Sequence, residues 1–196
     1  MEHYFSENPK SELKIKKIRQ RIIGINFEFY TSSGIFSKDA VDKGTLALAE
    51  NMAVIENDKV LDMGCGIGIL GIVAAKSFKA KVTMSDINQR AVMLSEKNTE
   101  LSKVDAKILQ GNLYEKIKDR DFDVIVSNVP QNAGKEVCFS IIEQSINHLK
   151  KNGTLQIVSR PNKGGKTYAK KMQEVFGNVQ EIGRKSGYSV YLSVKD

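Results

Sequence analysis

The chain has 196 residues, of which 41% are hydrophobic and 27% charged, and it contains only three prolines. This composition is typical of a folded protein, and the length fits one domain, since domains commonly run to about 100–200 residues. Thirty lysines and arginines against 23 acidic residues give a net charge of +7, which favours acidic partners. Two cysteines and two histidines without clustered spacing exclude a disulfide framework and a zinc-built fold, so no metal is expected.

The sequence also carries no pattern of a membrane protein. No apolar run approaches the roughly 20 residues that span a bilayer, and residues 1–10 lack the apolar stretch of a signal peptide. We therefore expect a soluble cytoplasmic protein with no membrane partner. The number of subunits is left open.

The first 40 residues differ in pattern from the rest. Residues 1–40 are expected to form a basic, β-rich extension, and residues 41–196 the core of the same single domain. Hydrophobic residues occupy every second position from Ile23 to Phe29, which is the pattern of a half-buried strand. Leu13 and Ile15 predict a partner strand before it, so the extension should contain a β-hairpin.

From residue 59 onward, short apolar runs alternate with helical patterns. Strands are predicted at residues 59–63, 81–85, 106–110, 122–127, 153–158, 178–182 and 188–194. Helices are predicted at residues 69–77, 89–101, 135–150 and 166–176, after an earlier helix that carries Leu46, Leu48, Met52 and Ile55. This alternation indicates an open α/β sheet of parallel strands. Residues 183–187 are too few for a crossover helix, so the last two strands should form an antiparallel hairpin.

A glycine-rich loop follows the first strand of the core. Residues 60–69 read V-L-D-M-G-C-G-I-G-I, a buried strand that runs into a glycine loop and the start of a helix. A plain tight turn is one interpretation, and a dinucleotide site is another, because Gly66, Gly68 and Gly71 satisfy G-x-G-x-x-G and Asp86 follows. Asp62 argues against the dinucleotide, since a carboxylate there would repel a pyrophosphate. A cationic ligand such as S-adenosylmethionine is favoured.

Several motifs together resemble those of one enzyme class. The glycine loop, Asp86, G-N-L-Y at residues 111–114 and S-N-V-P-Q at residues 127–131 resemble the motifs of class I S-adenosylmethionine-dependent methyltransferases. Residues 34–45 are similar to the entry of the small-domain methyltransferase family, which includes ribosomal RNA guanine-N2 methyltransferases and short archaeal relatives. The resemblance implies a Rossmann-like seven-stranded, mostly parallel sheet in the order 3-2-1-4-5-7-6 with an antiparallel last strand.

The resemblance also implies site residues. For S-adenosylmethionine, the expected contacts are Asp62, Gly64, Gly66, Gly68, Asp86, Ile87, Asn112, Leu113 and Thr45. Asp86 would accept hydrogen bonds from the ribose hydroxyls, and Asn112 with Leu113 would meet the adenine. A turn residue at Asn112 and an N-cap at Thr45 are the competing interpretations. The expected catalytic residues are Asn128, Val129 and Pro130, which would hold an exocyclic amino group toward the methyl group.

The S-N-V-P-Q segment at residues 127–131 departs at two positions from the motif of methyltransferases that act on amino groups. Val129 replaces the first proline, and Gln131 replaces the usual residue on which a planar base stacks. Phe36 is a candidate substitute platform, with a core residue as the alternative. Gln131 and Phe36 are therefore expected to contact the substrate.

Two basic segments predict an RNA partner. Residues 10–21 and 159–171 are rich in lysine and arginine, and they could form one surface that contacts phosphates. The expected contacts are Lys16, Lys17, Arg19 and Arg21, with Lys163 and Lys166 in the second segment. Solvated faces without function are the alternative.

The predicted function is methyl transfer to an exocyclic amino group of RNA, and guanine N2 of ribosomal RNA is the first candidate for the acceptor. A side-chain amide or a small molecule as acceptor, and a cofactor-binding RNA chaperone without turnover, remain the alternatives.

Overall fold

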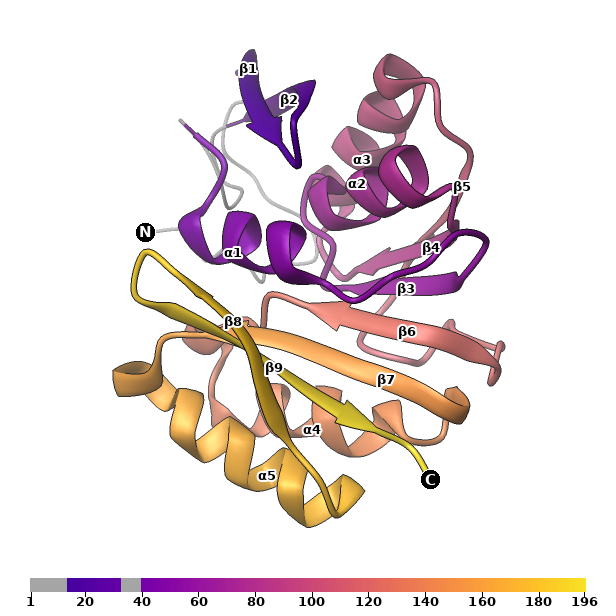
Figure 1. Ribbon diagram of the computed structural model, residues 1–196. Coiled ribbons are helices and arrows are strands. Elements are labelled where there is room, and N and C mark those ends of the chain that lie inside the picture. The colour runs from indigo at the N-terminus through magenta and orange to yellow at the C-terminus, as the bar shows by residue number, and fades with distance from the viewer. Residues whose placement is uncertain (1–13, 33–39) are drawn as a thin grey trace.

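The computed structural model describes residues 14–32 and 40–196, and within them every side chain except that of Gln131. Phe36, one of the predicted substrate contacts, lies outside the described residues. Figure 1 shows a central sheet between two layers of helices, with a small hairpin packed beside the helices of one layer. No described helix is long and apolar enough to cross a membrane.

In the part of the chain that the structure describes, the sheet has seven strands in the order β5-β4-β3-β6-β7-β9-β8. Their bounds are β3 Lys59–Met63, β4 Lys81–Asp86, β5 Ala106–Gln110, β6 Phe122–Ser127, β7 Leu149–Ser159, β8 Gln180–Lys185 and β9 Tyr188–Val194. The first five of these pair in parallel, whereas β9 is antiparallel to both of its neighbours. Counted from β3, this is the order 3-2-1-4-5-7-6 that the family resemblance implied, and the fold prediction is confirmed.

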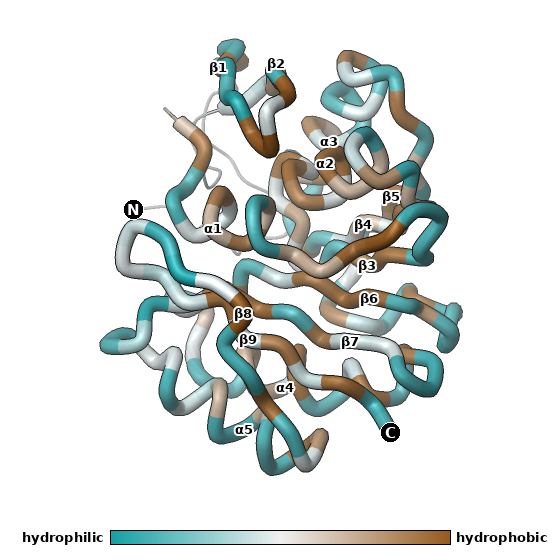
Figure 2. Tube along the Cα trace, viewed as in Figure 1, coloured by the Kyte–Doolittle hydropathy of each residue, from teal (hydrophilic) through white to brown (hydrophobic). Residues whose placement is uncertain are grey.

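Within the described residues, five α-helices cover the two faces of the sheet. They are α1 Lys43–Asn51, α2 Ile69–Phe78, α3 Gln89–Ser102, α4 Lys135–Ser145 and α5 Lys166–Phe176. The first three lie on one face, and α4 with α5 lies on the other (Figure 1). Both faces of the central strands are buried, so Val60 of β3 packs in one hydrophobic cluster and its neighbour Leu61 in the other. Figure 2 shows the matching hydrophobic stretches along β3 and β6.

The N-terminal hairpin pairs β1, Ile15–Ile22, with β2, Ile25–Ser32. Phe27 and Phe29 are buried and join the cluster formed with α1, α2 and α3. Ile23, which the alternation placed inside the strand, instead forms the two-residue turn with Gly24, both at positive φ (48° and 77°). Such turns match the twist of the flanking strands, which is why the strand begins at Ile25.

Several predicted boundaries were wrong. Helix α4 ends at Ser145 and not at residue 150, because Leu149 is buried and already pairs with Phe122 of β6. The helix that begins at Lys43 ends at Asn51, and Ile55 beyond it is 72% exposed. The last hairpin turns within Ser186 and Gly187, with φ of 52° and 78°, so β8 runs to Lys185, further than predicted.

Candidate active site

A pocket of about 740 Å³ lies at the carboxyl ends of the central strands. Ligands of open α/β sheets bind at the carboxyl ends of the strands, at the point where the strand order reverses, which here lies between β3 and β6. The predicted site residues that line it are Thr45, Gly64, Gly66, Asp86, Ile87, Asn112, Leu113, Asn128, Val129 and Pro130. The structure therefore brings together in one cavity residues that the sequence spreads over more than 80 positions.

The glycine loop is held by the end of the neighbouring strand. The backbone N–H groups of Gly64 and Cys65 donate to the Ser85 carbonyl at 2.8 and 3.0 Å. Gly64, Gly66 and Gly68 all have positive φ, a conformation that glycine adopts without steric cost. The loop thus presents its backbone to the pocket in a fixed shape.

Asp86 stands at the end of β4 and lines the pocket, as predicted. It is 4% exposed, and its Oδ2 accepts from the Gly66 N–H at 2.8 Å while Oδ1 accepts from the Asn88 N–H at 2.9 Å. Each carboxylate oxygen has more than one lone pair, so both can also accept from ligand hydroxyls. Asp86 both shapes the loop and offers an acceptor for vicinal hydroxyls.

Asp62 lies behind the pocket wall and is not one of the residues that line the cavity, and the same holds for Gly68. The Asp62 side chain is 1% exposed, and its Oδ2 accepts from the Gly71 N–H at 2.9 Å, which ties β3 to the first turn of α2. Burial, assisted by repulsion from Asp86, raises the pKa of Asp62 to about 7. In the structure Asp62 thus holds the glycine loop in place, and its contact with a ligand stays a prediction.

The region around Asp62 nevertheless fits a cation. Asp62 Oδ1 is buried and has no hydrogen-bond partner among the described residues. In front of Asp62, Asp42 and Asp86 place two carboxylates in the pocket wall itself. Buried acceptors without donors and several carboxylates disfavour an anionic pyrophosphate and suit a ligand with an ammonium or sulfonium group. The residues present therefore fit S-adenosylmethionine.

Asn128, directly after β6, has a fixed side-chain amide. Its Nδ2 donates to Asp42 Oδ2 at 3.0 Å and to Thr45 Oγ1 at 2.9 Å. Both amide hydrogens are thereby used, which identifies the remaining atom, Oδ1, as the acceptor available to a ligand. The orientation of the Asn128 amide is thus set by Asp42 and Thr45.

Thr45 is not the N-cap of α1. Asp42 is, because its Oδ2 accepts from the N–H groups of Gly44 and Thr45 at 2.8 and 3.0 Å. The same carboxylate oxygen receives the Asn128 amide, so one residue both begins the helix and positions the amide. Sequence analysis missed Asp42, although an aspartate directly before the first residue of a helix is a signal for an N-cap.

The loop after Asn128 is closed by a short 3₁₀ turn, Gln131–Ala133. The Pro130 carbonyl accepts from the Ala133 N–H at 2.8 Å, whereas the Val129 carbonyl has no partner among the described residues. Val129 itself is 3% exposed, lines the pocket and belongs to the hydrophobic cluster that includes residues of α4. Of the two backbone carbonyls, that of Val129 is the one free to receive a donor.

Tyr188 and Arg160 also line the pocket and were not predicted as site residues. The Arg160 guanidinium carbon lies 4.7 Å from the centre of the Tyr188 ring. Tyr188 packs against the start of α1, where a Cβ at Gly44 would come within 2.9 Å of its ring. Only a strand was predicted at Tyr188, and no sequence pattern linked it to the cavity.

The four predicted hairpin contacts lie outside this pocket. Lys17, Arg19 and Arg21 share the outer face of the hairpin, whereas Lys16 pairs with Thr31 on the opposite face. Lys17 and Arg19 both bind the Glu28 carboxylate, at 3.0 and 2.7 Å. The basic character of this face is therefore partly cancelled.

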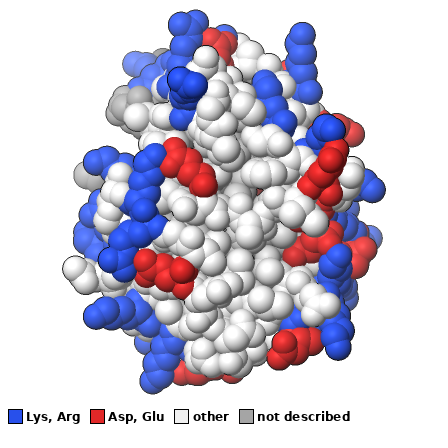
Figure 3. All heavy atoms as spheres, viewed as in Figure 1, with Lys and Arg blue, Asp and Glu red and all other residues white. Residues whose placement is uncertain are grey.

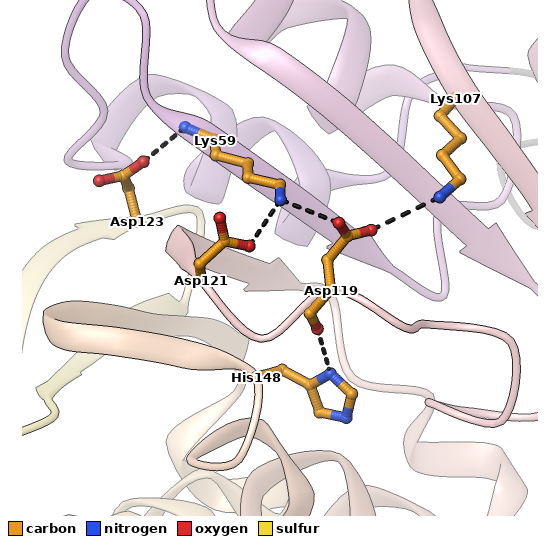
Figure 4. Close-up of polar contacts among 6 residues, drawn as sticks. All are labelled: Lys59, Lys107, Asp119, Asp121, Asp123 and His148. Carbon is orange, nitrogen blue, oxygen red and sulfur yellow. Dashed lines mark hydrogen bonds and ion pairs between the residues drawn. The ribbon is translucent and has the colours of Figure 1, made fainter.

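A second polar cluster is structural. Lys59 Nζ binds Asp119 and Asp121 at 2.9 and 2.6 Å, at the end of the sheet opposite the pocket (Figure 4). The Lys59 N–H donates to Asp123, and His148 Nδ1 contacts the Asp119 carbonyl. These contacts tie β3 to the segment before β6. Among the described residues, no group of histidine, cysteine and acidic side chains could hold a metal ion.

A family model described as "Methyltransferase small domain" matches residues 26–192. The chain belongs to this family. Family membership confirms the predicted enzyme class, an S-adenosylmethionine-dependent methyltransferase. The match begins within β2 and ends within β9, so it includes the glycine loop, Asp86 and Asn128.

Three relatives illustrate the range of similar proteins. An uncharacterized Bacillus subtilis protein, YbxB, is 35% identical over 198 residues, covering 99% of this chain and 98% of that protein. The ribosomal RNA small subunit methyltransferase C of Cronobacter sakazakii is 31% identical, covering 84% of this chain and 48% of its own length. The T. thermophilus 16S rRNA N2 G1207 methyltransferase, solved with AdoMet and guanosine, is 26% identical with a TM-score of 0.85, covering 96% of this chain and 52% of that one. The chain thus spans about half the length of these ribosomal RNA methyltransferases.

Proposed function

We propose that the protein transfers a methyl group from S-adenosylmethionine to an exocyclic amino group of RNA, namely N2 of a guanine in ribosomal RNA. The observation that carries the proposal is the Asn128 amide, whose two hydrogens are held by Asp42 and Thr45. Its Oδ1 is left to accept a hydrogen from an NH₂ group. The similarity to methyltransferases whose names specify ribosomal RNA and guanine N2 supports this acceptor.

The cofactor is assigned to residues by their chemistry. Asp86 would accept from the ribose hydroxyls, and Asn112 with Leu113 and Ile87 would border the adenine. Gly64 and Gly66 would meet the methionine portion through their backbone, with Asp62 holding the loop from behind. When bound, S-adenosylmethionine supplies an electrophilic methyl group on a positively charged sulfur.

The protein's contribution to transfer is orientation. Asn128 Oδ1 and the Val129 carbonyl would each accept one hydrogen of the target NH₂, which turns the nitrogen lone pair toward the methyl group. No strong base is needed, because the amine loses its proton after transfer. Catalysis then depends on positioning and on the placement of dipoles, effects that contribute several kcal/mol in well-ordered sites.

The experiment that tests this assignment is a set of Asn128 and Thr45 variants assayed with labelled methyl donor and unmodified ribosomal RNA. Asn128→Ala should lower kcat by about 10²–10³, the scale for one preorganised polar contact, and leave the Kd for S-adenosylmethionine within a few-fold. Normal turnover of Asn128→Ala would refute the orienting role.

Variants of Thr45 distinguish a role in orienting Asn128 from a role in binding the cofactor. Thr45→Val keeps the shape of the side chain but removes the hydroxyl that accepts from Asn128. We expect a lower kcat with unchanged cofactor affinity, while the matched control Thr45→Ser retains activity. A weakened Kd for S-adenosylmethionine with unchanged kcat would instead place Thr45 at the methionine carboxylate.

A further inference from the structure

A second cavity, of about 680 Å³, adjoins the active-site pocket. Two segments form it. The first runs from Arg160 through the π-turn Pro161–Gly165 to the first residue of α5, and the second comprises the end of β8 and the turn between β8 and β9. Among the residues that the structure describes, the lining of this cavity includes no acidic side chain and four cationic ones: Arg160, Lys163, Lys166 and Arg184. Figure 3 shows lysine and arginine side chains gathered along the side of the molecule where these two segments lie in Figure 1.

The two cavities share a wall. Arg160 and Lys163 line both of them. Arg160 lies over the Tyr188 ring, so a flat cationic surface and an aromatic ring stand where the basic groove meets the pocket. RNA bases stack on tyrosine rings and on guanidinium planes, and their phosphates bind lysine and arginine. The juncture therefore fits a nucleotide chain that continues from one cavity into the other.

The cations of the groove are available to a ligand. Within the described part of the chain, Arg160, Lys163 and Lys166 form no ion pair, and only Arg184 is matched, by both oxygens of Glu181. The hairpin differs, since Glu28 binds both Lys17 and Arg19. Uncompensated charge beside the pocket makes the groove a stronger anion site than the hairpin.

The backbone fixes the position of these side chains. The N–H groups of Lys163 and Gly165 both donate to the Arg160 carbonyl, at 2.9 and 3.1 Å. Gly164 has a φ of +96° and lies so close to Tyr168 that a Cβ would come within 2.9 Å of the ring. The turn is thus held from both sides, and little ordering of the backbone is required when an anion binds.

We propose that this basic groove binds the phosphodiester backbone of the RNA strand next to the acceptor nucleotide. The proposal rests on the proposed function, because it takes the strand's acceptor base to lie in the adjoining pocket. Arg160 and Tyr188 stack with a base at the juncture, while Lys163 and Lys166 contact the flanking phosphates.

The test compares two double variants that remove the same charge. Lys163→Gln with Lys166→Gln alters the groove. Lys118→Gln with Lys151→Gln alters exposed lysines near the amino ends of β6 and β7, at the end of the sheet opposite the pocket. Binding of fluorescein-labelled decauridylate is measured by anisotropy between 50 and 300 mM salt, and calorimetry with S-adenosylmethionine checks that each variant retains its pocket.

The groove variant should weaken decauridylate binding and lower the salt slope by about 0.7 for each phosphate that the variant no longer binds. The control variant should leave the slope unchanged. Equal weakening in both variants would show a general effect of net charge and overturn the proposal. So would displacement of decauridylate by inorganic phosphate at equal phosphate concentration, which would indicate a site for a small free anion.

The two proposals fail in different ways. If the wild type methylates RNA but both variants bind RNA alike, the groove proposal is wrong and the proposed function stands. If the groove variant alone loses decauridylate binding but the wild type methylates no RNA, the proposed function is wrong and the groove stands.

Discussion

The buried carboxyl of Asp62 should make the stability of the protein depend on pH. Its pKa is raised from 3.8 to about 7, chiefly because burial disfavours the charged form. A group whose pKa is raised by folding stabilises the folded state at low pH, and that contribution is lost as pH rises through the folded pKa. Stability due to Asp62 should therefore decline from about pH 4 to pH 7.

Asp62→Asn removes this dependence. The new amide oxygen can still accept from the Gly71 N–H, but the side chain no longer ionises. From pH 5 to pH 7 the free energy of unfolding of the wild type should fall by about 1.4 kcal/mol for each of the two pH units. Between pH 5 and pH 8 the variant should therefore gain roughly 2–3 kcal/mol of stability relative to the wild type. Any constant cost of burying the amide cancels in this comparison.

Urea unfolding of both proteins at pH 5, 6, 7 and 8 measures the effect. Asp105→Asn, which removes an exposed carboxylate, controls for the loss of one acidic group. Parallel stability profiles for the wild type and Asp62→Asn would refute the reasoning, because they would mean that Asp62 ionises in the folded chain as easily as in the unfolded one.

Three further predictions concern the hairpin and the end of the sheet opposite the pocket. Asn98 is buried, and its side chain forms hydrogen bonds with the N–H and the carbonyl of Tyr30 and with the Ile67 carbonyl. Asn98→Ala should therefore lower the free energy of unfolding in urea by about 1–3 kcal/mol and speed amide hydrogen exchange in β2, and unchanged exchange would contradict this. Glu28→Gln frees two hairpin cations and should strengthen decauridylate binding and steepen its salt slope if the hairpin contacts RNA, whereas no change would assign that face to solvent. Lys59 holds the pKa of Asp119 below its usual value, so stability from this pair is lost as pH falls; Lys59→Met should flatten the acid side of the stability profile, and an unchanged acid slope would show that the pair contributes nothing.

Much of the fold was predictable because its causes are local. The alternation of apolar runs and helical patterns predicted the succession of core strands and helices, and the short connection before Tyr188 predicted the antiparallel last strand. Boundaries were missed where long-range contacts decide them: Leu149 pairs with a strand rather than continuing a helix. The turn at Ile23 was missed because periodicity alone does not locate positive φ.

The site was predictable where chemistry follows a motif. Gly64, Gly66, Asp86 and Asn128 were found from sequence, and the structure brings them to one pocket. Asp42 and Tyr188 were not found, since their roles arise from contacts between distant segments. The Asp42 carboxylate meets Asn128, 86 positions away along the chain, and no spacing rule connects the two.

The nucleoside that receives the methyl group is the most direct test of the account. Ribosomal RNA from cells that lack this protein is incubated with the purified enzyme and labelled S-adenosylmethionine, digested to nucleosides and separated by chromatography with mass detection. The account predicts label in N2-methylguanosine, with the Asn128→Ala enzyme giving about 10²–10³ times less. Label on a ring nitrogen, on carbon or on ribose, or label in protein instead of RNA, would contradict the proposed orientation of an exocyclic amino group by Asn128.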